Sequence, residues 1–183
     1  MSEVKHWEVI SQRHLADCKV FTLLENTARS PRDQRDHQFY VLDSSDWVNI
    51  VPVTSAGDLV CIRQYRHGTD EITLEIPGGL VDPGEDPYDS ALRECLEETG
   101  YEAASASSLG VLRPNPALFP NYLHTYVAWD VEKVADIQNV STEQTEVVLL
   151  PMAELADVLM SGQIDHDLVV ATLWRFMYQY PGR

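Results

Sequence analysis

The sequence predicts an α/β sandwich with a mixed sheet, together with a small N-terminal antiparallel β appendage. Three observations carry this prediction. Short strand-like runs are spread through residues 46–150, one amphipathic helical pattern lies among them at 86–100, and two further helical patterns fill 151–180. Strands interleaved with helices favour a sheet that is covered by helices. With 183 residues, 44% of them apolar, the chain is long enough to bury a core without disulfides.

Residues 1–45 are predicted to form a separate β segment. Strand-like runs lie at 7–10, 20–24 and 38–42. The polar, basic stretch 25–37 between the last two runs is predicted to be a long connection. We therefore expect an appendage over 1–45 and the main domain over 46–183.

The main domain is expected to begin with a β-hairpin. Residues 47–53 and 59–65 are apolar strand patterns on either side of the turn 55–58. Further strands are predicted at 74–77, 108–112, 122–129 and 146–150. The order of these runs, with a helix in their midst, favours a mixed sheet.

Two helices are predicted at the C-terminal end. The first runs from about Pro151 to Met160 and ends at Gly162. The second is expected to begin at an Asp165 cap and to continue through Met177. The residues expected to pack on the sheet are Leu168, Ala171, Leu173 and Trp174.

Composition excludes several classes of protein. The net charge of −16 argues against binding to nucleic acid, because the phosphates would be repelled. No apolar run has the length of a membrane span, and the first residues lack the layout of a signal peptide. Three scattered cysteines do not make a disulfide framework. We expect a cytoplasmic protein with no membrane or nucleic-acid partner.

The helix over 86–100 gathers acidic residues on one side. Asp86 is a good N-cap, Pro87 suits the first turn and Gly100 suits the C-terminal end. One side is mainly apolar, and the other side carries Glu94, Glu97 and Glu98. Like charges at this spacing cost roughly 0.2–0.5 kcal/mol per pair, which a divalent cation would offset. The alternative is a solvated acidic face.

The residues before the helix resolve this choice. Gly79, five residues, Glu85, seven residues and then Arg93 to Tyr101 match the Nudix box at its fixed positions, with Cys95 where the family usually has an aliphatic residue. The chain thus resembles the Nudix hydrolases. The resemblance implies an α/β/α sandwich in which the box forms a loop, a helix and a loop.

The resemblance also implies a metal site. It assigns metal ligation to Glu94, Glu98, Glu97 and the backbone carbonyl of Gly78 or Gly79. Glu85 and Arg93 would orient the helix glutamates. The implied metal is Mg²⁺, with Mn²⁺ as a substitute. The general base in this branch often lies on a later loop, here 139–146, where Glu143 is the candidate and Glu146 the runner-up. The alternative is that both are ordinary surface glutamates.

Residues outside the box resemble the branch that hydrolyses ADP-ribose and nucleoside diphosphate sugars. These are the arginines Arg63 and Arg66 before the box, Pro116 sixteen residues beyond Gly100, and the tail 161–174. The candidate substrate contacts are Arg63, Arg66, Pro116 and Glu146. The alternative for Pro116 is an ordinary turn residue. The stretch 117–121 departs from the branch and leaves the terminal sugar open.

The branch also suggests an assembly. Its members are commonly homodimers that exchange N-terminal strands, so a homodimer through residues 1–45 is expected. Trp47 is the candidate platform for the nucleotide base; the alternative is a core tryptophan.

Three other functions stay open. The first is a Nudix hydrolase for nucleoside triphosphates, dinucleoside polyphosphates or coenzyme A. The second is a non-catalytic nucleotide-binding protein of this fold, although such proteins typically lose box glutamates. The third is an acidic protein that buffers metal ions.

Overall fold

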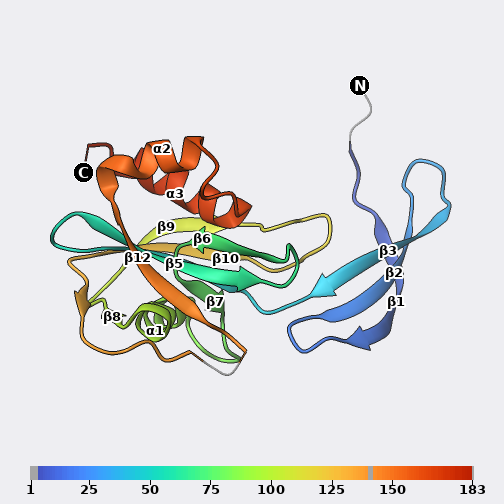
Figure 1. The fold of residues 1–183 in the computed structure, drawn as a ribbon. Coiled ribbons are helices and arrows are strands. Elements are labelled where there is room, and N and C mark those ends of the chain that lie inside the picture. Colours follow the sequence, from blue (N-terminus) through green and yellow to red (C-terminus); the bar gives the residue numbers. More distant parts are fainter. Residues whose placement is uncertain (1–3, 140–141, 183) are drawn as a thin grey trace. The chain divides into compact units, whose positions relative to one another are not determined.

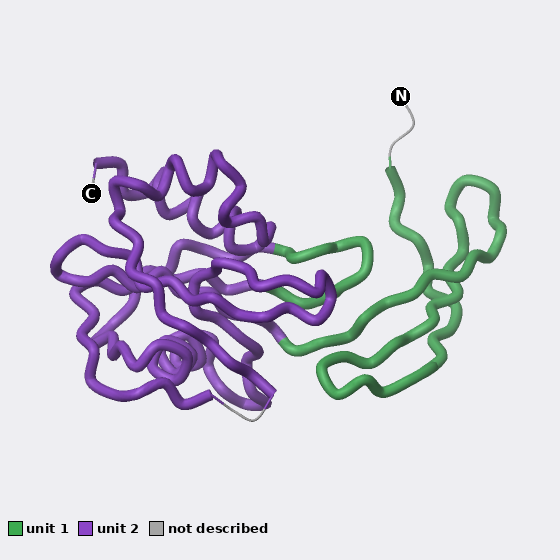
Figure 2. The backbone as a smooth tube through the Cα atoms, viewed as in Figure 1, with its two compact units in different colours: residues 1–45, 113–122 green, residues 46–112, 123–183 purple. Residues whose placement is uncertain are grey.

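The computed structural model describes residues 4–139 and 142–182 (Figure 1). The described residues divide into two compact units (Figure 2). The smaller unit consists of Met1–Ser45 and Arg113–Tyr122, and the larger unit of Asp46–Leu112 and Leu123–Arg183. The division into an appendage over 1–45 and a domain over 46–183 stays a prediction.

The smaller unit is built on an antiparallel sheet of order β1-β2-β3. Its strands are β1 (Glu8–Asp17), β2 (Thr22–Arg29) and β3 (Asp36–Asp43). The long connection predicted over 25–37 is wrong, because β2 continues to Arg29 and β3 begins at Asp36. Arg29 Nε donates to Asp36 Oδ1 at 2.8 Å and closes this hairpin. Polar residues fill these strands because much of the sheet is exposed, and this hides the alternation that marks a half-buried strand.

The loop 113–122 belongs to the smaller unit through backbone and side-chain contacts. Leu42 N donates to the carbonyl of Leu118 at 2.9 Å, and Asn121 Nδ2 donates to the carbonyl of Ser45 at 2.8 Å. Within the loop, the guanidinium of Arg113 lies 4.2 Å from the centroid of the Tyr122 ring. The loop is therefore fastened to the segment that follows β3.

The larger unit is built on a mixed sheet, as predicted. The main path has the order β12-β5-β4-β10-β9, with β6 paired to β5 and β7 paired to β4. The strands are β4 (Trp47–Val53), β5 (Asp58–Arg66), β6 (Glu71–Glu75), β7 (Gly78–Leu80), β9 (Ser107–Leu112), β10 (Leu123–Trp129) and β12 (Thr145–Pro151). Strands β10 and β4 are parallel, whereas β4–β5, β5–β12 and β9–β10 are antiparallel. A short ladder joins β8 (Tyr101–Glu102) to β11 (Glu132–Lys133).

Helices cover both faces of this sheet (Figure 1). Helix α1 (Pro87–Thr99) packs on one face, and η1 (Met152–Glu154), α2 (Leu155–Met160) and α3 (Asp167–Gln179) lie on the other. Successive side chains of a strand point to opposite faces. Accordingly, Val48 and Ile50 belong to the core under α1, and Val51 and Val53 belong to the core under α2 and α3. The α/β/α sandwich is confirmed.

Local signals placed the hairpin and α1 correctly. In the turn before β5, Thr54 N donates to the carbonyl of Asp58 at 2.9 Å. At the start of α1, Asp86 Oδ1 accepts from Tyr88 N at 2.8 Å. At its end, Gly100 has a φ of 73° in the left-handed region that favours glycine. Capping and turn chemistry thus set these boundaries.

The prediction for α3 was wrong at its start and on its buried face. The cap is His166 and not Asp165, and its side chain makes no capping hydrogen bond. The buried residues are Val169, Thr172, Leu173 and Phe176. Of the predicted set, only Leu173 is buried, and Trp174 is 43% exposed. The ring of Phe176 packs 5.8 Å from that of Trp129, which sets the rotation of the helix. Among the described helices, none combines the length and apolar character needed to cross a bilayer.

Candidate functional site

The loop before α1 is held against the helix by two glutamates. The backbone N–H of Gly78 donates to Glu98 Oε2 at 2.9 Å, and Glu98 is 5% exposed. A methyl group at Gly78 would collide with the carbonyl oxygen of Val48. A methyl group at Gly79 would collide with the carboxylate of Glu94. Gly79 therefore lets the backbone of β7 come directly against Glu94 of α1, and Gly78 lets it come directly against β4.

Arg93 is the centre of an ion-pair network on the same helix. Its Nε and Nη2 donate to the two oxygens of Glu85 at 2.9 and 3.0 Å. Its Nη1 donates to Glu94 Oε1 at 2.9 Å and to Glu97 Oε2 at 3.0 Å. The hydrogen bonds that Arg93 donates to Glu85, with the nearby Glu94 charge, raise the pKa of Arg93 above its ordinary value. Arg93 thus sets the directions of three carboxylates.

Burial disfavours the ionised forms of two carboxylates of this site. Burial raises the pKa of Glu98 to about 8; the Gly78 amide opposes this shift, and the charges of Glu94 and Glu143 add to it. Burial also raises the pKa of Glu94. A buried group of carboxylates whose ionised forms repel one another is an environment that a cation stabilises.

The donor set suits a hard divalent cation. Glutamate and carbonyl oxygens are the ligands that Mg²⁺ and Mn²⁺ prefer. Over residues 4–139 and 142–182, no three His, Cys, Asp or Glu side chains converge in a geometry ready to hold a metal. Arg93 holds Glu94 and Glu97, and the Gly78 amide holds Glu98. The ligand roles of these glutamates stay predictions that rest on this chemistry.

Glu94, Glu97 and Glu98 form an acidic cluster on α1. Glu143 lies close enough to affect the protonation of Glu94 and Glu98. Its carboxylate raises the pKa of both Glu94 and Glu98 by electrostatic repulsion. It borders an open hollow of about 590 Å³, whose lining residues are Gln64, Tyr65, His67, Asn139, Thr142, Glu143 and Gln144. Thr145 Oγ1 donates to the carbonyl of Glu98 at 2.8 Å, so the end of the Glu143 loop is fastened to α1. Val140 and Ser141 of the predicted loop lie outside the described residues.

Glu146 and Arg63 lie opposite each other on β12 and β5. Arg63 Nη1 is 3.7 Å from Glu146 Oε2, and both side chains are largely exposed. The carboxylate of Glu146 is thus directed at Arg63 on the neighbouring strand. The charge of Glu143 acts on Glu94 and Glu98.

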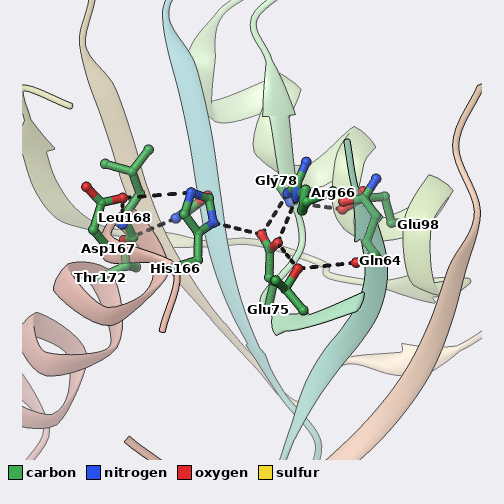
Figure 3. A network of polar contacts seen from close by, with 11 residues as sticks. Gln64, Arg66, Glu75, Gly78, Glu98, His166, Asp167, Leu168 and Thr172 are labelled. Atoms are coloured by element: carbon green, nitrogen blue, oxygen red, sulfur yellow. Dashed lines mark hydrogen bonds and ion pairs between the residues drawn. The ribbon is translucent and has the colours of Figure 1, made fainter. Parts of the chain in front are cut away.

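Arg66 occupies a different position, beside the cluster. Its Nε and Nη2 each donate at 2.7 Å to an oxygen of Glu75 (Figure 3). These bonds raise the pKa of Arg66, and the charges of Glu98 and Glu143 raise it further. Sequence reasoning missed Glu75 and its partner His166. The available signal was a charged residue, Glu75, between the apolar residues Leu74 and Ile76 of a predicted strand.

The remaining predicted residues lie in two places. Trp47 begins β4, half-buried, where its neighbours in register are Leu80 of β7 and Leu123 of β10. Pro116 lies in the 113–122 loop of the smaller unit. Their roles as base platform and as part of the substrate site stay predictions.

Comparisons with known proteins agree with this geometry. The family model described as NUDIX domain matches residues 45–173. The ADP compounds hydrolase NudE of Escherichia coli (strain K12) is 34% identical over 127 residues, which are 69% of this chain and 67% of that protein. An ADP-ribose pyrophosphatase of Bacillus subtilis (strain 168) is 25% identical over 118 residues, 64% of each chain. A crystal structure of an ADP compounds hydrolase has the same fold, with a TM-score of 0.86 and 24% identity over 98% of this chain and 96% of that one.

Proposed function

Because this chain belongs to the Nudix family of hydrolases, we propose that it hydrolyses the diphosphate linkage of ADP-ribose or related nucleoside diphosphate sugars with the help of a divalent metal ion. The observation that carries the proposal is the contact between the Gly78–Gly79 backbone and the carboxylates of Glu94 and Glu98. That contact brings the carboxylate oxygens of Glu94 and Glu98 against the backbone of β7. The products would be a nucleoside monophosphate and a sugar phosphate.

The protein's own groups have distinct tasks in this reaction. Glu94, Glu97 and Glu98, with a carbonyl of Gly78 or Gly79, would hold Mg²⁺ or Mn²⁺. The metal, when bound, supplies positive charge that screens the diphosphate and polarises the attacked phosphorus. Arg93 and Glu85 would keep the glutamates in position through the hydrogen bonds described above.

Glu143 is the proposed general base. It would accept a proton from a water molecule as the water oxygen forms a bond to phosphorus. The bridging P–O bond breaks, and the leaving phosphate takes the bonding electrons. The exposure of Glu143 beside an open hollow, together with its electrostatic effect on Glu94 and Glu98, supports this role. Glu146 is the second candidate, although its nearest charge is Arg63.

The substrate class is supported by the relatives and by the cations outside the box. NudE is named for ADP compounds and the Bacillus subtilis relative for ADP-ribose. Arg63 and Arg66 lie on β5, and we assign them to the substrate's phosphates. In a chain of net charge −16, such local cations are needed to attract an anionic substrate. Trp47 is proposed as the base platform, and Pro116 as part of the sugar site.

We further propose that residues 1–45 serve to form a homodimer. The sheet of the smaller unit exposes large apolar side chains, namely Trp7, Val9, Ile10, Phe39 and Tyr40. A second copy of the chain would remove this apolar surface from water. The partner would be another molecule of the same protein.

A panel of substrates tests the proposed function. Purified protein with Mg²⁺ would be incubated with ADP-ribose, ADP-glucose, UDP-glucose, GDP-mannose, a dinucleoside polyphosphate, coenzyme A and a nucleoside triphosphate. Chromatography would resolve the products. We expect a nucleoside monophosphate and a sugar phosphate from at least one diphosphate sugar. Turnover restricted to triphosphates, polyphosphates or coenzyme A would overturn the substrate class, and absence of all turnover would favour a binding protein.

A further inference from the structure

The buried carboxylate of Glu75 connects β5, β6 and the start of α3 in the larger unit (Figure 3). Glu75 ends β6, and its side chain is 2% exposed. It accepts hydrogen bonds from Arg66 Nε and Nη2 at 2.7 Å each, from His166 Nδ1 at 2.9 Å and from Thr73 Oγ1 at 2.6 Å. Burial alone would raise the pKa of Glu75, but these hydrogen bonds hold it well below its ordinary value. Glu75 is therefore a fixed negative charge.

His166 contacts Glu75 from the start of α3. It is the N-cap residue of α3, yet its side chain makes no capping hydrogen bond. Since an ionised carboxylate has no hydrogen to give, Nδ1 of His166 is the donor in its bond to Glu75. The start of α3 is thereby fastened to β6, and through Glu75 to Arg66 on β5.

The guanidinium of Arg66 lies near three carboxylates. It is paired with Glu75, while Glu98 and Glu143 lie close enough to raise its pKa. Figure 3 draws Arg66 between Glu75 and Glu98. The Arg66 side chain is 41% exposed, so part of the guanidinium is open to an anion from solvent. Without a well-fixed Glu75, the guanidinium would be free to pair with Glu98 or Glu143 and neutralise it.

We propose that Glu75 and His166 are positioning residues that hold Arg66 as a fixed cation for the substrate diphosphate and prevent it from pairing with Glu98 or Glu143. The inference rests on the proposed function, in which Glu98 is a metal ligand and Glu143 the base. It adds that the start of α3, through His166, takes part in the site without touching the substrate. A simple structural role for His166 would affect stability and leave the behaviour of Arg66 unchanged.

The chain offers matched variants for this test. His166→Ala removes the donor to Glu75, whereas His166→Asn keeps a nitrogen donor close to the position of Nδ1. Asp165→Ala is the control, because Asp165 is the neighbouring residue and is exposed. The thermal unfolding midpoint of each variant establishes that it is folded before any other measurement is interpreted.

The first measurement concerns Arg66 in the protein without substrate. With ¹⁵N-labelled arginine, the Nε–H signal that disappears in Arg66→Lys is assigned to Arg66. We expect slow hydrogen exchange of this signal in the wild type, in Asp165→Ala and in His166→Asn. We expect exchange at least about tenfold faster in His166→Ala, because a fixed guanidinium exchanges only after its hydrogen bonds open. Equal exchange in His166→Ala and the wild type would overturn the proposal.

The second measurement concerns the consequence for the reaction. For His166→Ala we expect kcat/KM to fall by about tenfold, mainly through KM, as for the loss of one phosphate contact. The Mg²⁺ concentration for half-maximal rate should rise, because Arg66 would compete with the metal for Glu98. His166→Asn should recover most of both losses. In a double-mutant cycle, His166→Ala should add less than about twofold to Arg66→Ala, since it acts through Arg66. Additive losses would contradict the proposal.

The two measurements separate the possible failures. If the wild type hydrolyses no diphosphate substrate, the proposed function fails. Arginine exchange and the dissociation constant for ADP, measured by calorimetry with Mg²⁺, then still decide whether His166 fixes Arg66 for a diphosphate. A dissociation constant for ADP that is unchanged in His166→Ala would refute the positioning role.

Discussion

The backbone amide of Gly78 donates a 2.9 Å hydrogen bond to the carboxylate of Glu98, twenty positions further along the chain. The bond joins β7 to α1 at the point where the acidic side of the helix meets the sheet. It satisfies one oxygen of a side chain that is 5% exposed. The Gly78 backbone therefore fixes the position of the Glu98 side chain, and Glu98 in turn holds β7 against α1.

Gly79→Ala should damage activity with little effect on the fold. The added methyl group meets the end of the Glu94 side chain, which is able to move aside, so we expect the free energy of unfolding to change by less than about 1 kcal/mol. The displaced carboxylate is a proposed metal ligand, so kcat/KM with Mg²⁺ should fall by at least about tenfold. Gly68→Ala is the control, since nothing lies within 4 Å of a methyl group there. Retention of more than half the wild-type kcat/KM by Gly79→Ala would refute this role of the loop.

Glu143→Gln should slow turnover because the amide does not accept the proton of the attacking water. At saturating Mg²⁺ we expect kcat to fall by at least about a hundredfold, within the range for loss of a general base. Glu146→Gln is the matched comparison on the same segment, and there we expect less than about a threefold fall in kcat. A fall of less than tenfold in Glu143→Gln would remove it as the base, and a large fall confined to Glu146→Gln would transfer the role.

The buried ion pair of Glu75 predicts how stability responds to acid. The pKa of Glu75 is held below its unfolded value of about 4.3, so the unfolded chain binds the proton more readily. The stabilisation is complete above about pH 5 and is lost as the pH falls toward the folded-state pKa. We expect Glu75→Gln to lose less than about 3 kcal/mol at pH 7, since the partner Arg66 is 41% exposed.

Urea unfolding of the wild type and Glu75→Gln between pH 7 and pH 3 checks this prediction. The difference between their free energies of unfolding should stay constant down to about pH 5 and shrink below it. A difference that does not change with pH would show that the charge of Glu75 contributes nothing to folding.

The exposed apolar residues of the smaller unit predict self-association. Sedimentation at micromolar concentration should show a dimer, and Phe39→Glu on β3 should shift it toward monomer. Met160→Glu adds the same charge at an exposed apolar residue of the larger unit, outside residues 1–45, and it should leave the dimer intact. A wild type that sediments only as a monomer would refute the proposed dimer.

Sequence reasoning succeeded where short-range chemistry sets the structure. The ends of α1 follow from Asp86 and Gly100, whose capping contacts lie within a few residues. The acidic side of the same helix follows from spacing alone, and Arg93, which was expected to orient the helix glutamates, donates to Glu97 at 3.0 Å. These features need no knowledge of the rest of the fold.

It failed where a partner distant in sequence decides the outcome. His166 contacts Glu75, which lies 91 positions away in the sequence. Neighbouring residues therefore could not predict the start of α3 or the hydrogen bonds around Arg66. The buried face of α3 depends on where Phe176 packs against Trp129. Strands β2 and β3 are rich in polar residues and lack clear alternation, and the contact between Arg29 and Asp36 that joins them forms only when the strands pair.

Glu98→Gln is the variant that best tests whether the box on α1 hydrolyses a diphosphate with a metal ion. The release of AMP from ADP-ribose at saturating Mg²⁺ would be measured for the wild type and the variant, with EDTA as the blank. We expect wild-type turnover that EDTA abolishes and a loss of at least about a hundredfold in Glu98→Gln. The metal-free variant should be no less stable than the wild type, because it loses a buried carboxyl whose pKa is raised to about 8. Turnover by Glu98→Gln within tenfold of the wild type, or wild-type turnover unaffected by EDTA, would contradict the claim.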